Sequence, residues 1–166
     1  MKYYIWLLPS PEQGMLLRQI IVDLARGFSQ PVFLPHLTLW SGTCRPNQAI
    51  EWMNDRANDL PLRVSLAAPT FGESNTQCVF VPIQPNEELR VLRQRAQQAL
   101  GTSKRQRPHL SLLYGEPSVA RRRDVSSTLQ LPFVELQLTE FALVQASNQV
   151  EEWRILHRVA SLRGNA

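Results

Sequence analysis

Apolar and polar positions along this chain follow two periods, one typical of strands and one typical of amphipathic helices. A short apolar run at residues 3–8 ends at Pro9, and a second run at residues 78–81 ends at Pro82. After each run, apolar residues return every three or four positions, as they do on one face of a helix. These apolar positions are Leu16, Leu17, Ile20, Ile21 and Leu24 in the first stretch, and Leu89, Leu92, Ala96 and Ala99 in the second. The pattern predicts a strand followed by a helix in each half of the chain.

The remaining segments predict further elements of both kinds. Some alternate between apolar and polar residues, as strands do, and others carry the helical period. The expected helices span about 46–57 and 117–128, and the expected strands span 62–67, 133–146 and 153–160. Strands mixed with helices around a duplicated unit predict an α+β fold.

The duplicated unit becomes visible when the chain is compared with itself. Residues 35–39 read Pro-His-Leu-Thr-Leu, and residues 108–112 read Pro-His-Leu-Ser-Leu. The two segments lie 73 residues apart, as do Pro9 and Pro82 at the ends of the earlier apolar runs. A matched spacing of this kind indicates an internal repeat. We therefore expect a single domain over residues 1–166 with two similar lobes, built on units at about 3–42 and 76–115, whose equivalent strands meet face to face.

Each repeat closes on a histidine and a hydroxyl two residues apart. Side chains at i and i+2 of a strand share a face, so His36 lies beside Thr38 and His109 lies beside Ser111, while the leucines between them point to the core. Two imidazoles can supply the base and the acid for displacement at a phosphodiester. Hydroxyls can stabilise the charge on the phosphate oxygens. The third histidine, His157, has no hydroxyl at i+2 and is interpreted as a structural or surface residue.

Composition adds constraints on location and partners. The chain has 166 residues, and no apolar run is long enough to cross a bilayer, so a cytoplasmic location is expected. Cys44 and Cys78 lack metal-ligand spacing and are read as reduced thiols, and no metal or cofactor is expected. The net charge of +4 favours anionic partners. The basic run at 104–107 directly precedes His109 and fits an anion site or a solvated loop equally well. A solvated role is favoured for the run at 121–123.

These residues resemble the 2H phosphoesterase superfamily, and most of all its plant and yeast type of cyclic nucleotide phosphodiesterase. The likeness is carried by residues 4–9, 35–38, 77–80, 108–114 and 151–153. It implies a bilobal fold in which antiparallel sheets flank a central, water-filled cleft, with helices outside. It also implies metal-independent hydrolysis of ADP-ribose 1″,2″-cyclic phosphate to the 1″-phosphate and of nucleoside 2′,3′-cyclic phosphates to 2′-phosphates.

The resemblance also assigns residues to the site. His36, Thr38, His109 and Ser111 match the catalytic positions of that family. Trp6 and Tyr114 match aromatic residues that line the nucleoside end of its cleft. Trp6 fits a core position in the first strand equally well. Strict alternation places Tyr114 opposite His109, so it can reach the cleft only if the strand twists or ends, which Gly115 allows.

Other functions remain open at this point. An RNA-processing 2H enzyme, either a 2′-5′ RNA ligase or a cyclic phosphodiesterase acting on RNA ends, would use the same four residues. The sequence Leu-Leu-Tyr-Gly at 112–115 disfavours the ligase, because such proteins commonly carry arginines there. A non-catalytic nucleotide-binding module would not need two poised imidazoles, and a purely structural domain would not explain the repeated histidines. A monomer acting on a small cyclic phosphate nucleotide is expected, without membrane contact, and which histidine is the acid is left undecided.

Overall fold

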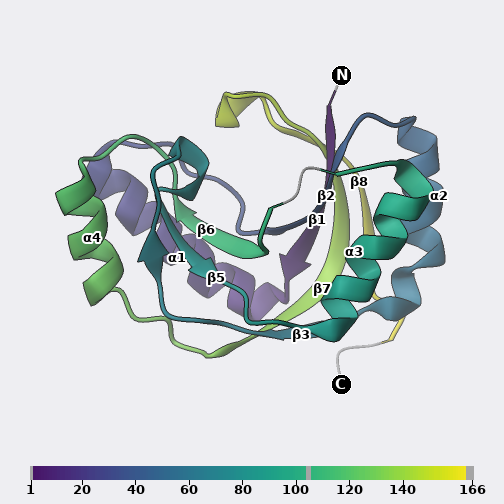
Figure 1. Cartoon of the computed structure of the whole chain (residues 1–166), viewed down its shortest axis with the longest axis horizontal. Coiled ribbons are helices and arrows are strands. Elements are labelled where there is room, and N and C mark those ends of the chain that lie inside the picture. The colour runs from purple at the N-terminus through teal and green to yellow at the C-terminus, as the bar shows by residue number, and fades with distance from the viewer. Residues whose placement is uncertain (1, 104–105, 164–166) are drawn as a thin grey trace.

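The computed structural model describes residues 2–103 and 106–163. Within this part, helices and strands alternate along the chain as the repeat predicts (Figure 1). In order, the elements are β1 (Tyr3–Pro9), α1 (Pro11–Phe28), β2 (Leu37–Gly42), α2 (Pro46–Asp55), β3 (Leu62–Ser65), β4 (Thr70–Phe71), β5 (Val79–Pro82), α3 (Glu87–Leu100), β6 (His109–Leu113), α4 (Val119–Thr128), β7 (Glu135–Gln145) and β8 (Arg154–Ala160). The predicted helices and strands are therefore confirmed. The two-residue strand β4 was not foreseen, and neither were short 3₁₀ helices at Ala57–Asp59, Asn75–Gln77 and Val150–Glu152.

The main helices begin at residues whose side chains cap free backbone N–H groups. Ser10 accepts a hydrogen bond from the backbone N–H of Gln13 at the start of α1, and Asn86 accepts one from Leu89 at 2.8 Å at the start of α3. Such caps stabilise a helix by about 1 kcal/mol each. The apolar stripes are narrower than predicted. Leu16 is 43% exposed and Ala99 is also exposed, because the sheet covers only one side of each helix.

The strands form one curled antiparallel sheet in the order β3-β7-β1-β2-β6-β5-β4, with β8 paired to β7. The two sheets expected from the repeat are thus the two halves of a single sheet. They join where β2 meets β6, through the pair Leu37 and Leu110. The equivalent strands β2 and β6 lie edge to edge rather than face to face. The other edge of β2 is paired with β1, and the other edge of β6 is paired with β5.

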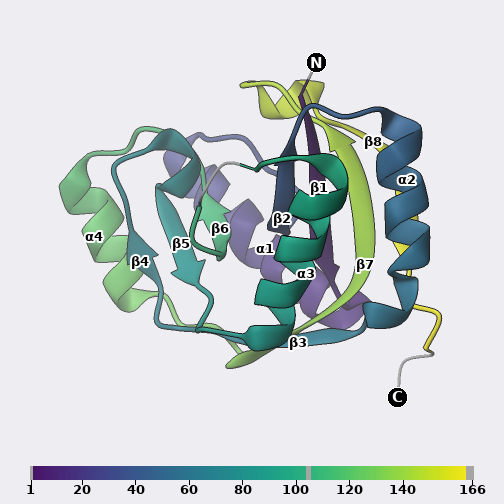
Figure 2. The same cartoon turned by 45° about the vertical axis from the view of Figure 1, so that its right-hand side comes forward.

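The helices cover the convex side of each half. Helices α1 and α4 pack on the β4–β6 half, and α2 and α3 pack on the half that contains β1, β2 and β7 (Figure 2). The repeats are interlocked, since α1 contacts β6 of the second repeat and α3 contacts β2 of the first. None of the helices in the described part of the chain combines the length and apolarity needed to cross a bilayer.

The core fixes which side of the central strands faces the open, concave side. Leu37, Leu39, Leu110 and Leu112 are all at most 1% exposed. Burying one such side chain stabilises the fold by roughly 1.5–3 kcal/mol. The strand period then turns the neighbouring histidines and hydroxyls to the other side, as the sequence predicted.

The basic run at 121–123 is solvated only in part, because Arg121 and Arg123 are exposed and Arg122 is buried. It lies in helix α4, and Arg122 is only 7% exposed. The Arg122 guanidinium donates to the backbone oxygens of Pro117 and Gly72, at 2.7 and 2.6 Å. Arg121 and Arg123 lie over the rings of Phe28 and Phe71. The prediction of a solvated loop was wrong for Arg122, because buried loop carbonyls need a donor, which sequence patterns do not reveal.

Candidate active site

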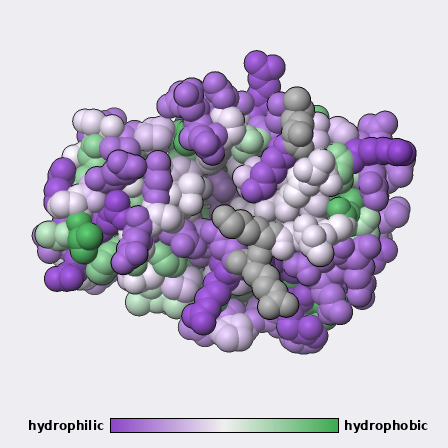
Figure 3. All heavy atoms as spheres, turned by 45° about the horizontal axis from the view of Figure 1, so that its top comes forward, coloured by the Kyte–Doolittle hydropathy of each residue, from purple (hydrophilic) through white to green (hydrophobic). Residues whose placement is uncertain are grey.

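The concave side of the sheet holds a cavity of about 660 Å³ between the two halves. The face that contains the cavity is hollowed near its centre and is mostly hydrophilic (Figure 3). Its lining includes all six residues singled out in the sequence, namely Trp6, His36, Thr38, His109, Ser111 and Tyr114. The structure therefore brings together two motifs that lie 73 residues apart in the chain.

Both imidazoles are oriented in the same way. Nδ1 of His36 donates to the backbone oxygen of Leu34 at 2.6 Å, and Nδ1 of His109 donates to that of Arg107 at 2.9 Å. The Gln77 amide nitrogen also lies 3.4 Å from Nδ1 of His109, but the shorter contact to a carbonyl, which can only accept, sets the tautomer. Nε2 of each ring is left to face the cavity, and this is the atom that can exchange a proton with a substrate.

His36 sits in an aromatic environment that suppresses its charged form. The side chain is 6% exposed and stacks on Trp6, with ring centroids 3.7 Å apart, while Trp153 approaches edge-on at 5.9 Å. Burial lowers the pKa of His36 to about 4, against the opposing effect of the Leu34 carbonyl, and His109 lowers it further. His36 is therefore neutral near pH 7.

His109 is more accessible, and its environment is more polar. Burial is again the main reason that the pKa of His109 is lowered. The Arg107 carbonyl acts in the opposite direction, and the positive charge of Arg93 adds to the lowering. An anionic phosphate in the cavity would favour the protonated form of either ring.

The low pKa of His36 predicts a measurable effect on stability. Because the folded-state pKa of about 4 lies below the ordinary value of 6.5, its contribution is fully present above pH 6.5 and is lost as the pH falls towards 4. The full difference is about 3 kcal/mol, at 1.36 kcal/mol per pKa unit. Urea unfolding at pH 7 and pH 4 is expected to show a smaller loss of stability for His36→Gln than for the wild type. A His157→Gln control should behave as the wild type, and equal losses in all three proteins would contradict this account of His36.

The two hydroxyls differ, although their motifs match. Ser111 is 3% exposed and donates to the backbone oxygen of Thr76 at 2.9 Å. Its proton is therefore committed to that carbonyl, and the Tyr114 hydroxyl interacts with the same side chain. For Thr38 the structure records no hydrogen bond of the side chain within the described residues. Thr38 is thus free to donate to a phosphate oxygen, whereas Ser111 must first rotate.

Tyr114 reaches the cavity by the route that the sequence allowed. Strand β6 ends at Leu113, and Gly115 has a φ of 122°, which redirects the chain. The Tyr114 ring stacks on Phe33 with centroids 4.0 Å apart, and burial raises the pKa of its hydroxyl to about 12. The phenol is therefore neutral and can position Ser111.

Trp6 is both a core aromatic residue and part of the cavity wall. It lies opposite Thr38 in the β1–β2 pair, which places it on the histidine side of the sheet. The side chain is 3% exposed, and one ring face is taken up by His36. Its indole Nε1 has no hydrogen-bond partner among the described residues.

Two aromatic residues that line the cavity, Tyr4 and Trp153, were not identified as site residues from the sequence. A third aromatic residue, Phe33, is buried in the core next to Trp153. Phe33 stacks on Tyr114, and Trp153 lies edge-on to Trp6, Phe33, His36 and Tyr114. Trp153 follows the segment 146–151, which also lines the cavity. The sequence did offer one signal for Trp153, because residues 151–153 belong to the segments that carry the family resemblance. No role in the site was assigned to them. Of the basic run at 104–107, Gln106 lines the cavity, while residues 104 and 105 lie outside the described residues.

Comparison with known proteins identifies the fold. No family model matches the sequence, and no curated protein matches it either. Among solved structures, TT0787 of Thermus thermophilus is similar over 97% of this chain and 98% of its own, with a TM-score of 0.63 and 19% identity. E. coli LigT complexed with NADP+ covers 96% of each chain, with a TM-score of 0.58 and 20% identity. A structure described as a phosphoesterase covers 96% and 97%, with a TM-score of 0.55 and 20% identity. The predicted α+β architecture is therefore confirmed, and this chain has the 2H phosphoesterase fold.

Proposed function

We propose that this protein is a metal-independent cyclic phosphodiesterase. The observation that carries the proposal is the pair of imidazoles in one cavity, each held by the carbonyl two residues before it so that Nε2 faces the substrate. The substrates would be nucleoside 2′,3′-cyclic phosphates and ADP-ribose 1″,2″-cyclic phosphate, and the products the 2′- and 1″-phosphates. The likeness to LigT, which has been solved with NADP+, ATP and 3′-AMP, supports a nucleotide as the ligand of this fold.

The reaction needs two proton transfers on opposite sides of phosphorus. In the hydrolysis of a cyclic phosphate, a base takes a proton from water as the water oxygen bonds to phosphorus. The bond from phosphorus to the ring oxygen breaks, and an acid protonates the departing alkoxide. His36 suits the role of base, because burial lowers its pKa to about 4 and keeps it neutral. His109 is then the acid, protonated when the phosphate is bound, and Thr38 donates to a non-bridging oxygen.

The aromatic residues give the cavity an apolar end suited to a nucleoside. Tyr114 and Trp153 line the cavity beside His36, and Phe33 supports Tyr114 from the core. Aromatic residues bind bases by stacking, worth about 1–3 kcal/mol per base. Trp6 would contribute through its edge and its free Nε1 rather than through the face that His36 occupies.

Incubation of the protein with either cyclic phosphate in excess EDTA tests this proposal. We expect 2′,3′-cyclic AMP to give the 2′-phosphate and ADP-ribose 1″,2″-cyclic phosphate to give the 1″-phosphate, because two imidazoles suffice for both proton transfers. Phosphorus NMR identifies the product in each case. Loss of turnover that a divalent ion restores would contradict the metal-independent scheme.

The same assay separates the alternatives. If neither compound is turned over, the assay is repeated with oligonucleotides that end in a 2′,3′-cyclic phosphate. Turnover of those alone would favour an enzyme acting on RNA ends. Binding of nucleotides without turnover of any substrate would favour a non-catalytic module.

A further inference from the structure

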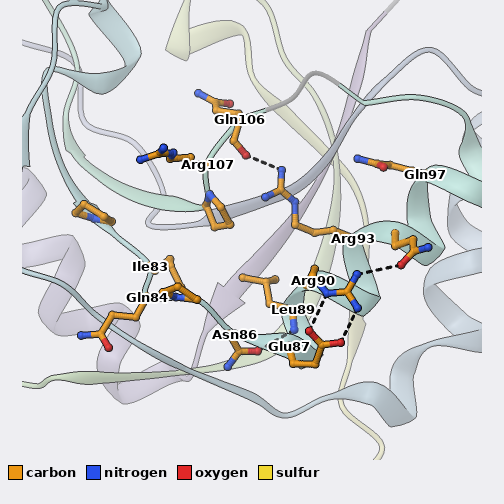
Figure 4. Close-up of a pocket in the computed structure, with 14 residues that line it drawn as sticks. Ile83, Gln84, Asn86, Glu87, Leu89, Arg90, Arg93, Gln97, Gln106 and Arg107 are labelled. Atoms are coloured by element: carbon orange, nitrogen blue, oxygen red, sulfur yellow. Dashed lines mark hydrogen bonds and ion pairs between the residues drawn. The ribbon is translucent and has the colours of Figure 1, made fainter.

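A second cavity is larger than the one that holds the histidines. It measures about 1210 Å³ and lies between helix α3 and the segment 106–108, and we call it the α3 groove. Figure 4 shows Arg90, Arg93 and Gln97 on the helix side, with Gln106 and Arg107 across from them. Its volume is more than sufficient for a nucleotide-sized ligand, since ligand sites typically measure about 300–1,000 Å³.

The α3 groove is lined by groups that bind anions. Three arginines line it, Arg90, Arg93 and Arg107, against one carboxylate, Glu87. Glu87 and Arg90 form an exposed ion pair, which leaves a net positive charge from the other two guanidinium groups. The remaining polar side chains are amides, and their N–H groups can also donate to phosphate oxygens. These amides belong to Gln84, Asn86, Gln94, Gln97 and Gln106.

Arg93 has donor capacity that the described residues do not use. One terminal nitrogen donates to the backbone oxygen of Gln106 at 2.8 Å (Figure 4). Its Nε is buried and has no partner among the described residues. Burial also lowers the pKa of Arg93, which means that its charged form is poorly solvated where it lies. A buried donor on a cation gains most from an anionic acceptor.

The α3 groove and the active-site cavity are neighbours, and both have Gln106 in their linings. A small constriction of about 10 Å³ shares Thr38 and His109 with the lining of the active-site cavity, and Arg93 and Arg107 with the lining of the α3 groove. Gln106 lines all three spaces. Arg93 is also close enough to His109 to lower the pKa of that imidazole. A ligand whose reacting phosphate lies at His109 would therefore have the arginines of the α3 groove beside it.

We propose that the α3 groove binds a second phosphate of the substrate, one that lies beyond the reacting cyclic phosphate. This inference rests on the proposed function for the position of the first phosphate. The second phosphate is either a terminal monoester of a mononucleotide or the phosphodiester of a short oligonucleotide, since the same guanidinium groups would recognise both. The α3 groove then makes the enzyme select substrates with two phosphates over substrates with one.

Three substrates that share one reacting group test the selection. They are adenosine 2′,3′-cyclic phosphate, its 5′-phosphorylated form, and the dinucleotide ApA that ends in a 2′,3′-cyclic phosphate. We expect kcat/KM to be about tenfold or more higher for at least one of the latter two, as for a new charge-assisted contact. Which of them is preferred distinguishes the monoester from the phosphodiester. The preference should shrink as salt is raised.

Substitutions in the α3 groove test whether it is the source of the preference for substrates with two phosphates. In the double variant Arg90→Gln/Arg107→Gln, the ratio of kcat/KM for the two-phosphate substrate to that for the one-phosphate substrate is expected to fall towards one. The control Arg18→Gln/Arg26→Gln removes the same charge from exposed positions of helix α1 and should keep the wild-type ratio. A wild-type ratio near one, or a ratio unchanged in the groove variant, would overturn the proposal.

A binding measurement tests the α3 groove even if the protein does not catalyse the proposed reaction. Calorimetric titration with adenosine 2′,5′-bisphosphate and with adenosine 2′-phosphate needs no turnover. The bisphosphate is expected to bind about tenfold more tightly to the wild type but not to the groove variant. Equal affinities in the wild type would overturn the α3 groove as a phosphate site, whatever the enzyme assay shows.

Discussion

Replacing His109 with alanine is expected to lower kcat for a 2′,3′-cyclic nucleotide by about 10³-fold or more, which is the range for the loss of a positioned general acid. His36→Gln is expected to have an effect of similar size, because glutamine cannot accept the proton from water. The two rings act in one displacement, so the double variant should be little worse than either single variant. Initial rates with 2′,3′-cyclic AMP, at saturating concentration, measure these changes.

The third histidine provides the matched control for this test. His157 lies on strand β8, outside the cavity lining, and His157→Ala should keep near-wild-type turnover. Circular dichroism and urea unfolding check that each variant is folded, which is expected for His109→Ala because that side chain lies at the cavity surface. Near-wild-type rates in a folded His109→Ala or His36→Gln protein would refute the acid–base pair.

Replacing Thr38 with valine is expected to lower kcat by about 10²-fold, the range for removal of one donor to a developing oxyanion. Valine keeps the shape of threonine and its place beside Trp6 in the β1–β2 pair, so the change is confined to the hydroxyl. Because the donor acts most strongly on the transition state, kcat should fall more than KM rises. Thr38→Ser, which restores a hydroxyl, should recover most of the activity.

Ser111 provides an internal comparison for Thr38. In the free protein its proton is donated to the Thr76 carbonyl, and its side chain also interacts with the Tyr114 hydroxyl. Ser111→Ala is therefore expected to reduce kcat less than Thr38→Val does, although the two motifs are equivalent in sequence. A larger effect at Ser111 would mean that substrate binding reorganises these hydrogen bonds and that the free-state geometry misidentifies the main donor.

Sequence periodicity predicted the local part of the site correctly. The strand period alone places His36 beside Thr38 and His109 beside Ser111, with leucines on the other face, and the structure shows those leucines buried. The helical period identified α1 and α3, although it could not show that Leu16 is exposed. Both periods reflect backbone geometry, which neighbouring residues determine without reference to the rest of the fold.

Tertiary contacts decided how the two repeats meet and where their symmetry ends. The pair Leu37 and Leu110 joins the halves into one sheet, and no local signal specifies a contact between residues so far apart in the chain. The stack of Trp6 on His36 and the contact of Arg93 with the constriction likewise come from elements outside the motifs. These contacts make the two imidazoles unequal, because burial and nearby charge determine pKa and differ between two otherwise equal copies. The sequence by itself thus determined that a histidine and a hydroxyl lie side by side on a strand, and that this pair occurs twice. Only the tertiary structure decided their distance, burial and partners, since these depend on packing between segments that are remote in the chain.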